Sequence, residues 1–354
     1  MRVGVVGVGL IGGSIGLALA QRLDAELTGF DPQAQTLAEA QRRGAIARAA
    51  SSPADAAREA QIVFVAAPIS ALPGAIDEVL AAAPADCVVT DVGSTKRALV
   101  AATDDPRFIG GHPLAGAETS GVEHARADLF EGATWYLTPG PTTSGELYER
   151  LHKTLAGIGA TPTAIDAADH DLVMASVSHL PHVFANVLVA QAARALGDER
   201  VPATGPSFRD ATRVAGASPT IWPDIYLSNR EALVALIDET QARLAKVRDA
   251  LASADRPAIE RWNDAARSDR EALLGAGLAG GSVYELRAAV PDRPGAVAEI
   301  ALALGRAGIN IVDIALAPAR DGRRGTVSLW VQGEEPAQRA VETIAALDIP
   351  VARA

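Results

Sequence analysis

The sequence is poor in cysteine and has no long uncharged apolar run. Among 354 residues the single cysteine, Cys87, cannot form an internal disulfide, so we expect a reducing, cytoplasmic location. Because Cys87 stands in an apolar run, it is interpreted as a buried strand residue and not as a nucleophile. No stretch of about 18 apolar residues avoids charge, Gly and Pro as a membrane span would, so we expect no membrane partner. The N-terminus leads directly into an apolar strand, which does not resemble a signal peptide.

The sequence also lacks an excess of positive charge. It contains 32 Lys and Arg against 43 Asp and Glu, a formal net charge of -11. A nucleic-acid partner is therefore not expected, because such a partner requires a basic face. A small acidic substrate remains compatible with this charge, since a few local arginines suffice to bind it. The length predicts two or three domains.

Residues 1–165 alternate short apolar runs with helical stretches. This alternation predicts an α/β domain, a Rossmann-type doubly wound parallel sheet covered by helices on both faces. A last strand near Thr163–Ile165 would close the domain. The other expected strands are Arg2–Val6, Leu27–Phe30, Ile62–Ala66, Val88–Thr90, Phe108–Gly110 and Thr134–Leu137, with helices including Ser14–Arg22 and Gln33–Arg43.

Residues 166–275 carry apolar positions at helical spacing and few strand signals. We expect an all-helical domain, with helices over Asp166–Gly197, Ser218–Ala252 and Arg256–Leu274. Helices this long and apolar usually pack against a large surface, so a homodimer is expected.

After a Gly-rich linker at residues 276–282, the period-2 pattern of strands returns. Residues 283–354 read as β-α-β-β-α-β, the order of a ferredoxin-like domain. The expected elements are strands Val283–Val290, Ile309–Ala317, Thr326–Val331 and Ile349–Ala352, and helices Pro294–Arg306 and Pro336–Ala346.

The segment Gly7-Val8-Gly9-Leu10-Ile11-Gly12 joins the first strand to the first helix and predicts a dinucleotide site. Its glycines allow a tight turn, close approach of a pyrophosphate and close packing of helix on strand, with the helix N-terminus facing the phosphates. Asp31 follows the second strand, where a carboxylate binds ribose hydroxyls and repels a 2'-phosphate, so NAD is preferred over NADP. The residues expected to contact NAD are Gly7, Gly9, Leu10, Ile11, Gly12 and Asp31.

His112 is the candidate catalytic base. It stands in the segment Gly110-Gly111-His112-Pro113, expected to be a turn after a strand, and ligands of such sheets lie at the carboxyl ends of the strands. A histidine there can take a proton from an alcohol as hydride leaves its carbon. Ser94, in another strand-end loop, could bond to this histidine or to the nicotinamide, or cap the next helix.

Two further pairs share a helical face. His179 and His182 are three residues apart, and we expect one of them to face the cleft and the other to pack. No Cys or Glu is spaced to complete a metal site, so no metal is expected. Arg209 and Arg213 are four apart, and their guanidinium forks suit carboxylates; surface pairing with Asp210 or Glu231 is the alternative.

In combination these motifs resemble the prephenate dehydrogenase family of tyrosine biosynthesis. The resemblance covers nearly the full chain, and the C-terminal module resembles an ACT domain. The segments that carry it are Gly9-Leu10-Ile11-Gly12-Gly13-Ser14, Asp91–Lys96, His112-Pro113-Leu114-Ala115-Gly116, Ser178-His179-Leu180-Pro181-His182, and, for ACT, Asp292-Arg293-Pro294-Gly295 with Gly308-Ile309-Asn310.

The resemblance implies NAD-dependent oxidative decarboxylation of prephenate to 4-hydroxyphenylpyruvate. It implies that His112 accepts the proton of the ring hydroxyl and that Ser94 orients His112 beside the nicotinamide. Arg213 would hold a carboxylate, acting mainly through orientation, because binding a departing group stabilises the ground state. The remaining implied substrate residues are His182 and Ser178 in the pocket, Glu118 at its mouth, and Arg209, which could meet the side-chain carboxylate across a dimer.

The ACT resemblance implies control by an amino acid, and L-tyrosine is the expected effector. ACT domains commonly pair, with the effector near the first loop and the start of the second strand of a neighbour. The implied effector-binding residues are Asp292, Pro294, Gly295, Gly308 and Asn310.

Three alternatives stay open. An arogenate dehydrogenase differs only in an amine for a ketone on the substrate side chain. A β-hydroxyacid dehydrogenase shares the layout but relies on a helical-domain lysine, and Lys246, the only lysine after Lys153, lacks the expected motif. A non-enzymatic sensor of NAD or amino acids would not need His112, Ser94 and Arg213 together.

Overall fold

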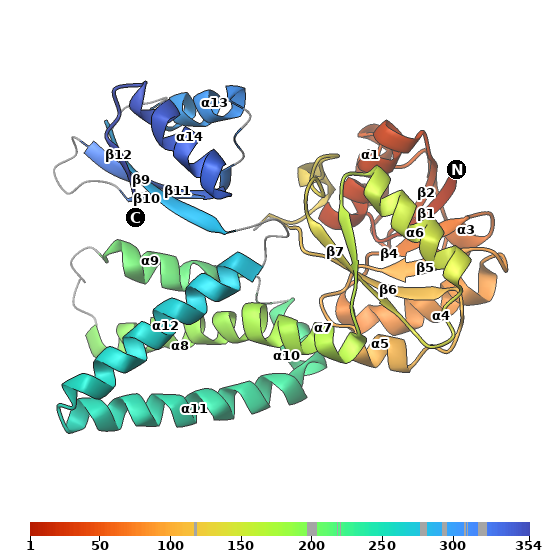
Figure 1. The fold of residues 1–354 in the computed structure, drawn as a ribbon. Helices are drawn as coiled ribbons and strands as arrows, with labels where there is room; N and C mark the ends of the chain where they lie inside the picture. Colours follow the sequence, from red (N-terminus) through yellow and green to blue (C-terminus); the bar gives the residue numbers. More distant parts are fainter. Residues whose placement is uncertain are drawn as a thin grey trace. The chain divides into compact units, whose positions relative to one another are not determined.

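The computed structural model describes residues 1–116, 119–196, 204–217, 219, 221–276, 282–291, 296–307, 309, 311–317 and 324–354. The chain divides into two compact units, Met1–Gln241 and Ala242–Ala354, and the dividing point falls within one helix, α11 (Arg230–Ala252). Figure 1 shows the elements of each unit, which are described separately below.

The first unit is built on an eight-stranded sheet with the order β3-β2-β1-β4-β5-β6-β7-β8. Strands β1 to β6 pair in parallel, as the alternating sequence pattern predicts. The strands are β1 (Arg2–Val6), β2 (Glu26–Phe30), β3 (Arg48–Ala49), β4 (Ile62–Val65), β5 (Val88–Asp91), β6 (Phe108–Pro113), β7 (Thr134–Pro139) and β8 (Thr161–Ala164).

Helices cover both faces of this sheet (Figure 1), which confirms the expected Rossmann-type fold. Adjacent strand residues alternate between two cores, with Phe64 in one and Val65 in the other. Packing on the two faces comes from α1, α2 and α6 on one side and α3, α4 and α5 on the other. These helices are α1 (Leu10–Leu23), α2 (Ala34–Arg42), α3 (Pro53–Ala57), α4 (Leu72–Ala82), α5 (Arg97–Ala101) and α6 (Gly145–Gly157).

The end of β6 differs from the turn that the sequence predicts. His112 was expected in a turn, but it lies within β6 and is in register with Tyr136 of β7. Strand β7 runs antiparallel to β6. The return of the chain through residues 114–133 requires no crossover helix, because an antiparallel neighbour can enter the sheet from the same edge. The pairing extends β6 through the Gly-Gly-His-Pro segment, whose composition alone favours a turn.

The rest of the first unit is helical, as expected. One continuous helical stretch consists of α7 (Ala167–Met174), a π-helical segment (Ala175–His179) and α8 (Leu180–Leu196). Pro181 has no N–H to donate to the preceding turn, which fits a widened segment just before it. The expected helix over Ser218–Ala252 is broken at Asn229. The other elements are α9 (Pro206–Thr212), a 3-10 turn (Arg213–Gly216), α10 (Trp222–Ser228) and α11.

Within the described residues, the stretch Ala167–Ala195 is long and apolar enough to cross a membrane by length and composition alone, and 22% of its most apolar window is buried. A helix in the core of a water-soluble protein passes the same test, so one such stretch is weak evidence for a membrane span. Phe184, Val187 and Leu188 are among its exposed apolar side chains.

The second unit contains the rest of α11, α12 (Arg256–Ala276) and a four-stranded antiparallel sheet with the order β10-β11-β9-β12. Helices α13 and α14 pack on one face of this sheet (Figure 1), so the predicted ferredoxin-like arrangement is confirmed. The elements are β9 (Val283–Pro291), α13 (Ala296–Arg306), β10 (Ile311–Ala317), β11 (Arg324–Gln332), α14 (Glu334–Ala345) and β12 (Val351–Arg353).

Candidate active site

The loop between β1 and α1 has the geometry that a pyrophosphate requires. Gly7 has a φ of 88°, which favours glycine, and a Cβ at Gly12 would lie 1.8 Å from the carbonyl oxygen of Gly7. A Cβ at Gly9 would meet nothing within 4 Å, so the space in front of this residue is open. Gly9 precedes α1 without a side-chain cap, which leaves the first N–H groups of the helix for a bound anion.

Asp31 ties the end of β2 to this loop. Its Oδ2 accepts a hydrogen bond from Val8 N at 3.2 Å, and its Oδ1 accepts one from Gln33 N at 3.0 Å. The carboxylate is half-buried and keeps lone pairs for further donors. Leu10 and Ile11, also half-buried, form the first turn of α1. These residues fit the adenosine and pyrophosphate of a dinucleotide.

His112 lies near the carboxyl end of β6 and is 9% exposed. Its Nδ1 lies 2.9 Å from Nε2 of His170, which is fully buried in α7, and the two rings meet edge to face. Burial, followed by the nearby His170 and the positive charge of Lys96, lowers the pKa of His112 well below its ordinary value. His112 is therefore a neutral imidazole at physiological pH and can accept a proton.

The other ring nitrogen of His170 contacts Asp171. This Nδ1 lies 2.8 Å from Oδ1 of Asp171. The two Asp171 carboxylate oxygens accept hydrogen bonds from the backbone N–H groups of Lys96, at 2.7 Å, and Arg97, at 3.0 Å. Asn229 donates to the carbonyl oxygen of Asp171 at 2.7 Å. The order His112, His170, Asp171 is thus fixed by buried hydrogen bonds.

A buried ion pair between Lys96 and Asp91 lies next to His112. The Lys96 ammonium contacts Asp91, and both side chains are fully buried. Lys96 Nζ also donates to the carbonyl oxygen of Gly111 at 2.8 Å, next to His112. Asp91 accepts hydrogen bonds from the N–H groups of Gly93 and Gly111, at 2.8 and 3.0 Å. Burial lowers the pKa of Lys96, and the charge of Asp91 opposes this shift. The pair joins β5, the loop after it and β6 into one rigid platform.

A pocket of about 620 Å³ lies beyond the end of β6. Three residues predicted to bind substrate, Ser178, His182 and Arg213, line it together with Trp222. Burial lowers the pKa of His182 and the positive charge of Arg213 adds to this effect, while a hydrogen bond to the Ser178 carbonyl oxygen opposes it. The pocket can receive an anion at Arg213 and a planar group beside Trp222.

The two helix histidines separate as expected. His182 lines the pocket, whereas His179 is buried and its Nδ1 lies 3.2 Å from Nδ2 of Asn229. The two arginines do not share one regular helix, because α9 ends at Thr212 and Arg213 begins a 3-10 turn. Arg209 is exposed on α9 and does not line this pocket.

Other predicted positions are placed differently or lie outside the described residues. Among described residues, no hydrogen bond joins Ser94 to His112, whose Nδ1 bonds with His170 instead. The helix after Ser94 starts at Arg97 with Lys96 as its N-cap, so Ser94 is not its cap. In the described part of the chain, no three His, Cys, Asp or Glu side chains gather to hold a metal. Glu118, Asp292, Pro294, Gly295, Gly308 and Asn310 lie outside the described residues.

Five parts of the site are not predicted by the sequence patterns: His170, Asp171, Asn229, Trp222 and the Lys96–Asp91 pair. The Asp91–Lys96 segment was recognised as a motif, yet its two charged ends had no assigned role. An adjacent His-Asp pair at the start of an apolar helix was the available signal for His170 and Asp171.

The fold and site define an NAD-dependent dehydrogenase. The family model for the nucleotide-binding domain of prephenate dehydrogenase matches residues 15–163, its dimerization-domain model matches 166–263, and the ACT model matches 284–348. A prephenate dehydrogenase from Bacillus subtilis is 32% identical over 97% of this chain and 95% of its own length. The chain belongs to the prephenate dehydrogenase family and carries a C-terminal ACT domain.

Two solved structures resemble the chain closely in fold. Prephenate dehydrogenase from A. aeolicus, in complex with hydroxyphenyl propionate and NAD+, is 28% identical with a TM-score of 0.71, covering 77% of this chain and 98% of its own. Arogenate dehydrogenase from Synechocystis is 27% identical with a TM-score of 0.67, covering 77% of this chain and 100% of its own. The chain is thus an NAD-dependent oxidoreductase.

Proposed function

We propose that this enzyme converts prephenate and NAD to 4-hydroxyphenylpyruvate, CO2 and NADH. The observation that carries the proposal is the neutral, buried His112 near the carboxyl end of β6, with the Arg213 pocket just beyond that end. The relative from A. aeolicus, which holds an aromatic carboxylate together with NAD+, supports this choice of substrate.

The residues of this chain divide the work between proton transfer and binding. Bound NAD, held by Gly7, Gly9, Leu10, Ile11, Gly12 and Asp31, supplies the hydride acceptor. His112 takes the proton of the ring hydroxyl as its carbon loses hydride, and the bond to the ring carboxylate then breaks to release CO2. The electron pair of that bond restores the aromatic ring, and His112 returns the proton to the phenolic oxygen. No net proton is released.

Arg213 holds a carboxylate of the substrate, while Ser178 and His182 contact it from α8 and the segment before it. Ser94 faces the nicotinamide in this proposal, and Glu118 stands at the pocket mouth. Arg209, exposed on α9, meets the side-chain carboxylate across a homodimer. The exposed apolar residues of α8 and the matched dimerization-domain model support such a dimer.

The ACT domain supports control by an amino acid, and we assign L-tyrosine as the effector, bound near Asp292, Pro294, Gly295, Gly308 and Asn310. We place the enzyme in the cytoplasm, in keeping with a single buried thiol. Small-molecule substrates, not nucleic acids or membranes, are its partners, and no metal takes part in the proposed mechanism.

The similarity to an arogenate dehydrogenase favours a second candidate substrate, arogenate. The deciding experiment follows NADH absorbance with purified enzyme, NAD and either prephenate or arogenate, with and without L-tyrosine. We expect turnover of prephenate that L-tyrosine lowers. Turnover of arogenate alone would change the substrate and keep the chemistry. No turnover with either would leave the sensor hypothesis in place. If millimolar L-tyrosine changes neither the turnover rate nor the thermal stability of the enzyme, L-tyrosine is not the effector.

A further inference from the structure

Two buried groups behind the catalytic histidine, His170 and Asp171, determine which of its nitrogens carries a proton. Asp171 accepts two backbone hydrogen bonds and has no proton to donate as a carboxylate, so the Nδ1 of His170 must donate to it. In a neutral imidazole the other nitrogen then accepts, so Nε2 of His170 accepts from Nδ1 of His112. The lone pair of His112 is therefore left on Nε2.

We propose that His170 is a positioning residue that transmits the charge of Asp171 to His112. The transmitted hydrogen bonds hold His112 in the tautomer that can act as a base. They also bring a negative charge near the imidazolium that forms when Nε2 takes the substrate proton, which offsets the positive charge of Lys96 nearby. No proton needs to move along the chain of hydrogen bonds. The expected changes in kcat rest on the proposed function, whereas the protonation of His112 in the free enzyme does not.

Two substitutions separate this role from simple packing. Oδ1 of Asp171 faces both Nδ1 of His170 and the N–H of Lys96, so in Asp171→Asn the amide oxygen keeps that position and the amide N–H groups face Arg97. This variant removes the negative charge and keeps the tautomer of His112. We expect kcat to fall about tenfold in Asp171→Asn, from the lost charge, and by about 10²- to 10⁴-fold in His170→Leu, where no group fixes the tautomer of His112. His170→Leu removes the acceptor of the His112 N–H. In His170→Gln the Oε1 can accept from His112, so its kcat should be at least tenfold higher than that of His170→Leu. KM for both substrates should change little, whereas the Tm should fall because each change leaves a buried polar group without its partner. His152→Gln, in α6, is the control.

A second measurement does not depend on turnover. The ring ¹⁵N chemical shifts of His112, assigned with His112→Asn, report which nitrogen is protonated in the free enzyme. We expect a protonated Nδ1 in the wild type and in Asp171→Asn, and a mixture of the two tautomers in His170→Leu. A wild-type His112 protonated on Nε2, or a His170→Leu enzyme with wild-type kcat, would overturn the inference. An inactive wild type with the expected shifts would count against the proposed reaction alone.

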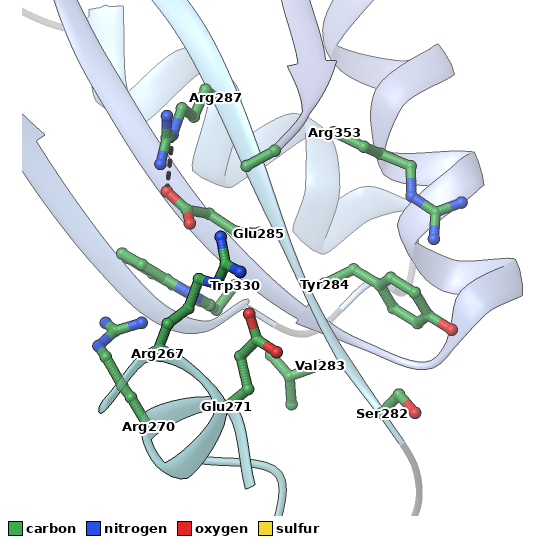
Figure 2. Close-up of a pocket in the computed structure, with 11 residues that line it drawn as sticks. Arg267, Arg270, Glu271, Ser282, Val283, Tyr284, Glu285, Arg287, Trp330 and Arg353 are labelled. Carbon is green, nitrogen blue, oxygen red and sulfur yellow. Dashed lines mark hydrogen bonds and ion pairs between the residues drawn. The ribbon is translucent and has the colours of Figure 1, made fainter. Parts of the chain in front are cut away.

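A different observation concerns a cavity of about 830 Å³ that lies wholly within the second unit (Figure 2). The cavity opens between α12 and the face of the sheet that α13 and α14 do not cover. Alternation along β9 identifies this face: Leu286, Ala288 and Val290 point into the helix-covered core, and Glu285 and Arg287 point to the other side. None of its lining residues belongs to the NAD or substrate site described above.

Four arginines line this cavity although the whole chain has a net charge of -11. Three of them have acidic partners: Arg287 pairs with Glu285 at 2.9 Å, Arg267 with Asp264 at 3.1 Å, and Arg353 with Glu334 at 3.5 Å. Among described residues Arg270 makes no hydrogen bond or ion pair. Its positive charge contributes to the lowered pKa of Glu285. Trp330, which pairs with Glu285, faces α12 across this cavity. Tyr284 lies at the edge of the cavity on the other side of β9, where it packs against the helix-covered core and Arg353 lies over its ring at 4.3 Å (Figure 2).

The structure assigns this cavity, we infer, to a small aromatic carboxylate. The Arg270 guanidinium offers a planar fork to the carboxylate, and the ring of Trp330, on the same side of the sheet, offers a flat apolar surface to the aromatic group. A cavity of this volume is of the size that holds small molecules. The site is distinct from the loops assigned above to the effector.

The test uses the full chain and 3-phenylpropionate as the probe. The indole N–H signal of Trp330, assigned with Trp330→Phe, should shift in a saturable way. Arg270→Gln should raise the Kd of this shift about tenfold, the loss of one charged fork contact. Arg256→Gln on the same helix, outside the cavity, is the matched control. The uncharged 3-phenylpropionamide should leave the signal unmoved. No saturable shift at millimolar probe, or equal shifts with acid and amide, would overturn the assignment. Arg213→Gln should not alter this signal, whatever the catalytic activity.

Discussion

The imidazole of His182 stacks on the indole of Trp222, with ring centroids 3.5 Å apart and an angle of 27° between the planes. Nδ1 of the same imidazole bonds with the Ser178 carbonyl oxygen at 2.9 Å. A carbonyl accepts only, so Nδ1 carries the proton and Nε2 is left as an acceptor. The stack and this hydrogen bond hold His182 in one orientation in the wall of the substrate pocket.

Removal of the stacking partner should therefore weaken substrate binding more than catalysis. We expect Trp222→Leu to raise KM for prephenate about 3- to 10-fold, within the energy of an aromatic pair, and to change kcat less than twofold. Trp222→Phe should retain most of the affinity because it still stacks. Steady-state kinetics of the two variants check this, and equal KM values for Trp222→Leu and the wild type would contradict it.

His112→Asn should lower kcat by roughly 10²- to 10⁴-fold, the usual contribution of a general base, with a much smaller change in KM. Because burial lowers the pKa of His112 well below its ordinary value of 6.5, the wild-type base stays neutral as the pH falls through 6.5. The rate should therefore show no loss from this group between pH 8 and 6.5. A variant with near-normal kcat would remove His112 from the chemistry.

Arg213 should act mainly on substrate binding. Arg213→Lys keeps the charge but loses the planar fork, and we expect KM for prephenate to rise roughly 10- to 100-fold with a smaller fall in kcat. Arg194→Gln, an exposed arginine of α8, serves as the control. If Arg213→Lys lowers kcat and leaves KM unchanged, the arginine acts on the reaction step and not on binding.

Asp31 should decide between the two dinucleotides. In Asp31→Asn the negative charge that repels a 2'-phosphate is gone, while an oxygen remains to accept the N–H of Val8. We expect kcat/KM for NAD to fall about tenfold and the preference for NAD over NADP to shrink by more than that. The measurement compares both cofactors, with the exposed Asp77→Asn of α4 as the control. An unchanged preference would argue that other residues select the cofactor.

The stability of the fold should fall in acid because of His179. Burial lowers the pKa of His179 to about 4 from 6.5, so the folded state binds fewer protons than the unfolded state between these values. This contribution to stability is complete above pH 6.5 and is lost as the pH falls from 6.5 towards 4. Urea unfolding at several pH values should show a shallower pH dependence for His179→Gln than for the wild type. Identical slopes would assign the effect to other groups, His112 among them.

Much of the architecture could be predicted because periodicity and glycine spacing are local properties. Most strands of both sheets, the dinucleotide loop and the separation of His179 from His182 follow from patterns within a few residues. The two-residue edge strand β3 (Arg48–Ala49) was not predicted. The contact of His112 with His170 joins positions 58 residues apart and depends on how α7 packs beside β6 and β7. Likewise His112 was expected in a turn because Gly-Gly-His-Pro lacks strand propensity, and the pairing with β7 overrides it.

The most direct test of the proposed reaction measures NADH and CO2 together from prephenate and NAD with the purified enzyme. The proposed mechanism predicts the two products in a ratio of one to one, with 4-hydroxyphenylpyruvate in equal amount and no net release of protons. NADH without CO2 would show a dehydrogenation that leaves the ring carboxylate in place and would contradict the mechanism. Absence of both products would contradict the proposed substrate.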